Sequence, residues 1–405
     1  MEQKKWAFRL SLTAFFFYFC MSGQSYLTVY LKSIGYSVTQ VSLINALIFV
    51  AAIISTPLGG RIADKMHSSR KALFIGLLCW ATCFFLAPIS RNLTIIGVNV
   101  SVIAIIAGRF FQGPTKALID PTLITLSNNN HTSFGSVRIW GTISYVLMCF
   151  LLGYIIKDDT SYLNFYITAC CLIPTALCFL SLKKLDNDEQ IIRKEEPKSD
   201  KEALKTLLTS PYFILYVIFI VLEKVPHNCV NTYMAYMIEI VGGPMSFIGY
   251  IAGYKAAFEI PALLLSDRLQ KKMTFRQMVI VSALLQGIQC VLYWRVHDFT
   301  SLLLATTLAG IGSGFSIAGS FKYVFVLSPK QAKSTAQTVV GAMENAAGIA
   351  SNLLGAWMIT LFGIRTFYLI IGSCLIASVI MFVVGNHLIE KVWKVPFIDY
   401  TKIEE

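Results

Sequence analysis

Long apolar segments separated by short polar connections run through most of the chain. Most are about 20 residues long, the length that an α-helix needs to cross the hydrocarbon core of a bilayer. They span residues 8–31, 40–62, 71–89, 94–126, 136–156, 161–182, 211–238, 244–266, 276–295, 299–326, 335–361 and 365–387. The pattern predicts an all-α membrane protein with twelve transmembrane helices.

A stretch dense in charges of both signs, residues 183–205, divides the apolar segments into two sets of six. The second segment is followed by Ile-Ala-Asp64-Lys65 and the eighth by Leu-Ser-Asp267-Arg268, so the two halves carry a related motif. We therefore expect two pseudo-symmetric six-helix bundles. The expected domains are an N-terminal bundle at 1–182, a cytoplasmic linker at 183–210, a C-terminal bundle at 211–390 and a cytoplasmic tail at 391–405.

Charge is sparse and unevenly placed. Charged residues make up 14% of the chain and hydrophobic ones 56%, yet the net charge is +12. Most of the 34 Lys and Arg residues fall on alternate connections, and the positive-inside rule then puts both termini and the linker in the cytoplasm. This placement accounts for the basic character, so we expect the lipid bilayer as a partner and no nucleic acid. The compact connections favour a bacterial inner membrane.

The ten cysteines show no framework spacing and no Cys-x-x-Cys motif. Most lie inside apolar segments, where cysteine behaves as a small hydrophobic residue. We expect no disulfides, no metal site and no cofactor. A nucleotide-binding loop and a nucleophile triad are also missing from the sequence, so an enzyme is not expected and energy must come from a gradient.

Two opposite charges stand out around the turn between the fourth and fifth segments. Asp120 lies near the end of one apolar segment, and Arg138 opens the next one eighteen residues later. Ionisable residues inside a bilayer are costly and usually face the protein interior, where they bind something or pair with each other. The two charges are therefore either half of a substrate site or a structural ion pair between two helices.

Two motifs resemble those of the major facilitator superfamily of transporters. Gly60, Asp64, Lys65 and Arg70 match its signature in the loop between helices two and three, which implies a gating role. Glycine there would allow close approach of helix ends, and the acid could accept hydrogen bonds from basic donors. The alternative is an ordinary basic loop.

The second motif is Arg109-x-x-Gln-Gly, which matches the superfamily's helix four. An arginine within an apolar helix is expected to face water or an acid, so we place Arg109 on the cavity side as a substrate-binding candidate. A packing arginine satisfied by backbone carbonyls is the alternative. Gln24, a polar residue inside the first apolar segment, is expected to face the same interior.

Asp120 and Arg138 also resemble a pattern in the lactose permease family of oligosaccharide–proton symporters, and in the related phenylpropionate-type carriers. That family places an acid and an arginine eighteen residues apart, before an aromatic-Gly pair, here Trp140-Gly141. The resemblance implies that Asp120 and Arg138 bind sugar hydroxyls. It also implies that Tyr145, seven residues after the arginine, stacks on the sugar ring.

The second half departs from that family, because its proton-carrying cluster has no counterpart here. The charges that stand in apolar segments instead are Glu223, Lys224, Lys255, Glu259 and Glu344. We expect Glu259, Glu223 or Glu344 to carry the proton, because an acid in a low-dielectric site can titrate near neutral pH. Lys224 with Glu344, and Lys255 with Glu259, are expected structural ion pairs. His227 is either a cavity residue or a packing histidine.

The sequence thus predicts a secondary transporter that works by alternating access, with a small molecule and protons as partners and a monomer as its working form. Proton-coupled uptake of an oligosaccharide or similar polyhydroxylated solute is the preferred interpretation. The alternatives are uptake of an aromatic carboxylate or a nucleoside, or export of a drug or metabolite.

Overall fold

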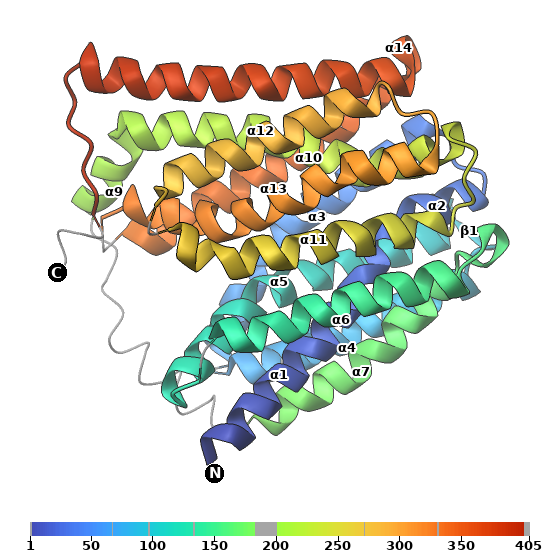
Figure 1. Cartoon of the computed structure of the whole chain (residues 1–405). Helices are drawn as coiled ribbons and strands as arrows, with labels where there is room; N and C mark the ends of the chain where they lie inside the picture. The colour runs from blue at the N-terminus through green and yellow to red at the C-terminus, as the bar shows by residue number, and fades with distance from the viewer. Residues whose placement is uncertain are drawn as a thin grey trace. The chain divides into compact units, whose positions relative to one another are not determined.

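The computed structural model describes residues 2–66, 68–95, 98–132, 134–182, 201–270, 272–329 and 332–400, and nearly all of them are helical. The only strands in these ranges are β1 (Thr94–Ile95) and β2 (Val98–Asn99), which pair antiparallel. Figure 1 shows long helices joined by short connections. The long helices are α1 (Glu2–Met21), α3 (Val38–Lys65), α4 (Ser69–Ile89), α5 (Val100–Asn129), α6 (Phe134–Ile155), α7 (Leu163–Ser181), α10 (Pro211–Ile240), α11 (Phe247–Leu269), α12 (Phe275–Tyr293), α13 (Phe299–Val326) and α14 (Lys333–Lys391).

Ten of these helices are long and apolar enough to cross a membrane. The first predicted segment and the second half of α14 bring the spans to twelve, so the prediction of an all-α membrane protein is confirmed. The two halves of α14 meet at Gly363, whose φ of 72° and ψ of 162° are not helical. Glycine tolerates this backbone conformation without a Cβ clash, and the break separates α14 into two helical segments that correspond to the predicted spans 335–361 and 365–387.

The chain divides into two compact units, residues 1–196 with 243–256, and residues 197–242 with 257–405. In the first unit α1 packs on α6 and α7, while α5 packs on α3 and α4; Figure 1 shows α1, α4, α6 and α7 side by side. In the second unit α10 and α12 pack on α14, and α12 also packs on α13. The first part of α11 is grouped with the first unit and the rest with the second.

The first predicted span, 8–31, is broken rather than continuous. After α1 the chain forms a 3-10 turn, η1 (Ser22–Tyr26), and then the short helix α2 (Leu27–Ser33). A Cβ on Gly23 would collide with the side chains of Asn164 and Thr168 on α7, so glycine permits the close approach of the two helices. A 3-10 stretch within a helix often marks a functional position.

The predicted linker and tail are only partly described. Residues 183–200 and 401–405 lie outside the described ranges, whereas α9 (Lys201–Thr209) begins inside the predicted linker. The tail packs onto the second unit, because Tyr212 donates to the Val395 carbonyl at 2.9 Å and the Tyr400 amide donates to the Val326 carbonyl at 3.1 Å.

Candidate substrate site and charged network

Tyr18 of α1 links the two charges that the sequence singled out. Its hydroxyl donates to Asp120 Oδ1 at 2.6 Å, and the Arg138 guanidinium carbon lies 3.8 Å from the centre of its ring. Arg138 also donates from Nη1 to Thr142 Oγ1 at 3.1 Å. Among the described residues, no ion pair joins Asp120 to Arg138. The structure therefore gathers both charges around one aromatic side chain instead of pairing them directly.

Gly141 of α6 makes room for that side chain. A Cβ on Gly141 would lie 2.5 Å from Tyr18 Cδ2, closer than carbon atoms can approach without displacement. The neighbouring Trp140 is 51% exposed. Of the pair Trp140-Gly141, the glycine is thus the residue that leaves space for the Tyr18 ring.

Tyr145 lies one turn beyond Gly141 on the same helix. It is half-buried against the apolar core of the first unit, and its hydroxyl is a hydrogen-bond partner of the Cys149 thiol. The predicted stacking of its ring on a substrate stays a prediction.

Arg109 of α5 is buried, with 7% of its surface exposed. It donates from Nη1 to Gln112 Oε1 at 2.6 Å, and its guanidinium carbon lies 5.6 Å from the Phe84 ring centre. Its Nε has no hydrogen-bond partner, and the described ion pairs do not include this residue. Gln24 in η1 is exposed and donates to the Met21 thioether at 2.9 Å. Both predicted residues therefore adjoin a small cluster of polar donors in the first unit.

A charged network occupies the second unit. Lys224 Nζ lies 3.2 Å from Glu223 Oε2 and 3.5 Å from Glu344 Oε1. Gln286 of α12 donates to Glu223 Oε1 at 3.2 Å and to Ser282 at 3.0 Å. His227 Nδ1 and Gln286 Oε1 are 3.0 Å apart. The structure brings together Lys224 and Glu344 as the sequence predicted, and adds Glu223 and Gln286 to the same network.

The charge in this network does not balance. Two carboxylates share one ammonium group, so a neutral His227 leaves one negative charge in excess. Glu223 is buried at 2% exposure, whereas the Glu344 side chain is 39% exposed. An excess charge at membrane depth is costly, and a proton on either carboxylate would remove it.

Lys255 and Glu259 lie one turn apart on α11, and both are half-buried. Lys255 is grouped with the first unit and Glu259 with the second. Their predicted pairing, and Glu259 as proton carrier, stay predictions.

The predicted gating loop is partly described. Gly60 has open space around its Cα, and the close helix approach occurs at Gly59, where a Cβ would collide with Pro114 of α5. The gating role of Gly60 stays a prediction. Lys65 is exposed and Arg70 donates to the Leu180 carbonyl at 2.9 Å, which ties α4 to α7. The side chain of Asp64 lies outside the described residues.

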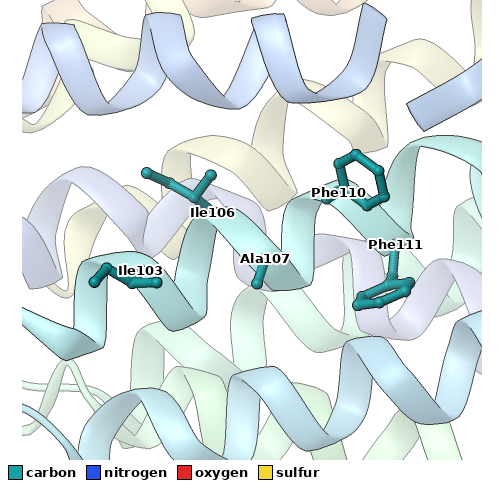
Figure 2. Close-up of a pocket in the computed structure, with 5 residues that line it drawn as sticks. All are labelled: Ile103, Ile106, Ala107, Phe110 and Phe111. Atoms are coloured by element: carbon teal, nitrogen blue, oxygen red, sulfur yellow. The ribbon is translucent and has the colours of Figure 1, made fainter. Parts of the chain in front are cut away.

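An apolar pocket of about 400 Å³ lies along α5. Figure 2 shows that all five labelled side chains come from this one helix: Ile103, Ile106, Ala107, Phe110 and Phe111. The pocket contains none of the predicted site residues. The described residues also include no group of three or more His, Cys, Asp or Glu side chains that could hold a metal ion.

The tyrosine and the glutamine at the centres of the two clusters were not among the predicted site residues. Tyr18 stands in an aromatic run, Phe-Phe-Phe-Tyr-Phe, where its hydroxyl is the only polar group. Gln286 is one of three amides in the ninth apolar segment. In both cases a neutral polar group in an apolar segment was the available signal.

Comparisons with known proteins identify the kind of molecule. Residues 7–370 match the model of the MFS_1 like family. A maltose permease of Geobacillus stearothermophilus is 22% identical over 345 residues, which cover 82% of each chain. The uncharacterized transporter YwbF of Bacillus subtilis is 22% identical over 356 residues, covering 87% of this chain and 86% of the relative.

Solved structures of the same architecture include the nucleoside transporter NupG, with a TM-score of 0.75, 18% identity and coverage of 94% of this chain and 99% of that one. A POT family transporter in complex with 5-aminolevulinic acid gives a TM-score of 0.70 at 15% identity, with 95% and 96% covered. At these identities the likeness shows the fold, which is the major facilitator fold.

Proposed function

The chain belongs to the MFS_1 like family of membrane transporters, and on that premise we propose that it takes up an oligosaccharide or similar polyhydroxylated solute together with protons. The cluster of Tyr18, Asp120 and Arg138 carries this proposal. Its carboxylate accepts and its guanidinium donates hydrogen bonds, each able to bind adjacent hydroxyls in pairs. This is the chemistry that a sugar requires.

Tyr145, Gln24 and Arg109 complete the proposed site in the first unit. A half-buried tyrosine near a charged cluster can cover the C–H face of a sugar ring. The relationship to a maltose permease supports a sugar as the solute.

We assign the proton to the network of Glu223, Lys224 and Glu344. Its excess of one carboxylate over one ammonium group favours binding a single proton. Glu344 is our first choice as the carrier, because its side chain is the more exposed and Glu223 also accepts from Gln286. Glu223 and Glu259 are the other candidates.

We also propose a membrane location, a topology, an oligomeric state and a gating loop. We place both termini in the cytoplasm and the protein in a bacterial inner membrane as a monomer, as the distribution of Lys and Arg and the compact connections favour. The loop with Gly60, Asp64, Lys65 and Arg70 is proposed to latch the cytoplasmic side.

Transport by the purified protein in proteoliposomes tests the proposal. We expect labelled maltose to accumulate when the outside is more acidic than the lumen, and only to equilibrate without the pH gradient. Asp120→Asn should weaken maltose binding by about tenfold or more, because charge-assisted hydrogen bonds to hydroxyls are lost. Glu344→Gln should retain maltose exchange and lose accumulation.

Two other results would change the assigned solute or the assigned proton carrier. Competition for binding by uridine but not by any sugar would make the protein a nucleoside carrier. Undiminished accumulation by Glu344→Gln would move the proton to Glu223 or Glu259, which the corresponding glutamine variants then separate.

A further inference from the structure

Four side chains around the end of α1 contain more hydrogen-bond donors than acceptors. Arg109 Nε has no partner, while the amide groups of Gln112 and Gln24 both donate to the sulfur of Met21, at 3.5 and 2.9 Å. A thioether sulfur is a weak acceptor. The strong acceptors within the cluster are two amide oxygens: that of Gln112, which already accepts from Arg109 Nη1 at 2.6 Å, and that of the exposed Gln24. The cluster is therefore rich in donors and poor in acceptor oxygen.

Burial makes this imbalance expensive. Arg109 is 7% exposed, Gln112 6% and Met21 6%. A buried guanidinium is normally matched by a carboxylate, and among the described residues the ion pairs include none with Arg109. Its ring contact with Phe84 at 5.6 Å compensates only part of the lost hydration.

We propose that Arg109, Gln112 and Gln24 form a subsite for a carboxylate of the transported solute. A carboxylate supplies two acceptor oxygens with about four lone-pair sites, which matches the donors of this cluster. Met21 is unbranched and flexible, so its sulfur can leave the two amides when a stronger acceptor arrives. Gln24 lies in the 3-10 turn η1 and is exposed, so this end of the cluster is not covered by other parts of the described chain.

The subsite rests on the proposed function and narrows its substrate class. Arg109 and Asp120 are eleven residues apart on α5, which puts them within 20° of the same helix face and about 16 Å apart along the axis. A solute that reaches both residues has an acid group at one end and hydroxyls at the other, at roughly the length of a disaccharide. The predicted class is therefore an oligosaccharide acid, such as an aldonic acid with a second sugar ring.

A ligand-free measurement separates binding from packing. If Arg109 binds a carboxylate, its uncompensated buried charge destabilises the unliganded protein. Arg109→Gln should then leave the melting temperature unchanged or raise it. If Arg109 holds the fold, the same variant should melt clearly lower. Arg91→Gln is the matched control, because Arg91 also lies over an aromatic ring, that of Tyr162, but outside this cluster.

Binding to the purified full-length protein gives the second test. Maltobionate and maltitol, and lactobionate and lactitol, are pairs that differ only by a carboxylate in place of a hydroxymethyl group. We expect the acid of at least one pair to bind about tenfold or more tightly than its alcohol. The ratio should fall to about one in Arg109→Gln and be partly kept in Arg109→Lys.

The outcomes distinguish this inference from the proposed function. The subsite is wrong if neither acid binds more tightly than its alcohol, or if the preference persists in Arg109→Gln. Proton-driven maltose uptake that depends on Asp120, without any acid preference, would keep the proposed function and overturn the subsite. An acid preference that depends on Arg109 but not on Asp120 would keep the subsite and overturn the sugar site.

Discussion

Arg109 and Arg138 of the first unit have different surroundings from Lys224 of the second. Arg109 and Arg138 of the first unit lie against the rings of Phe84 and Tyr18, and the ion pairs of the described residues include neither of them. Lys224 of the second unit lies between two carboxylates. A cation that contacts only rings and neutral groups retains donors for a ligand, whereas a cation between two acids is already compensated. The comparison suggests that solute recognition belongs to the first unit and charge balance to the second.

Removal of Lys224 should produce the largest effect on stability. Lys224→Met leaves Glu223, which is buried, and Glu344 facing each other without a cation, and we expect a loss of about 3 kcal/mol or more in the free energy of unfolding. Thermal or denaturant unfolding in detergent measures it. Adding Glu223→Gln should restore most of the loss, because the buried charge is removed with its partner.

Arg109→Gln in the first unit is expected to leave the free energy of unfolding unchanged. If Arg109→Gln and Lys224→Met lowered it by similar amounts, both units would use their cations for folding.

Gly141→Ala should have a smaller effect, confined to binding. The new Cβ would lie 2.5 Å from the Tyr18 ring and displace it from Asp120 and Arg138. We expect affinity for the solute to fall by about tenfold, while the melting temperature changes little. Gly341→Ala is the matched control, because no atom outside its own helix segment lies within 4 Å of the added carbon. Equal affinities of the two variants would remove Tyr18 from the site.

More of the fold than of the candidate site could be predicted from the sequence. Apolar segments of membrane-spanning length predicted the helices, including the break between 335–361 and 365–387 that the structure shows at Gly363, and the structure differs in the first span, where a 3-10 turn interrupts the α-helix. Gly23 lets this turn lie close to α7. The glycine does not change the apolar pattern, so hydropathy alone could not locate the turn.

Some residues of the candidate site were predicted from the sequence, and others were missed. Asp120, Arg138, Lys224 and Glu344 were predicted because a charge within an apolar segment is rare. Tyr18 and Gln286 were missed because a neutral polar side chain in an apolar segment is a weaker signal than a charge, and their contacts depend on packing. Tyr18 meets Asp120 across 102 residues, and Gln286 meets Glu223 across 63. Long-range packing of this kind has no signal in a single sequence.

The smallest effect is expected at an exposed acid of the second unit, which provides a reference for its buried ones. Asp298 caps α13 and accepts from the Ser301 amide at 2.7 Å; that hydrogen bond holds the pKa of its carboxyl below the usual value. A depressed folded pKa stabilises the protein above the unfolded pKa of about 4, and the stabilisation disappears as the pH falls through the folded pKa. Asp298→Asn keeps a capping side chain without its charge. The variant should melt slightly below the wild type at pH 7, and the difference should shrink as the pH falls below the unfolded pKa and through the folded one. A large difference that persists at acid pH would mean that carboxylates matter in this unit through packing rather than charge, and would weaken the contrast between the two units.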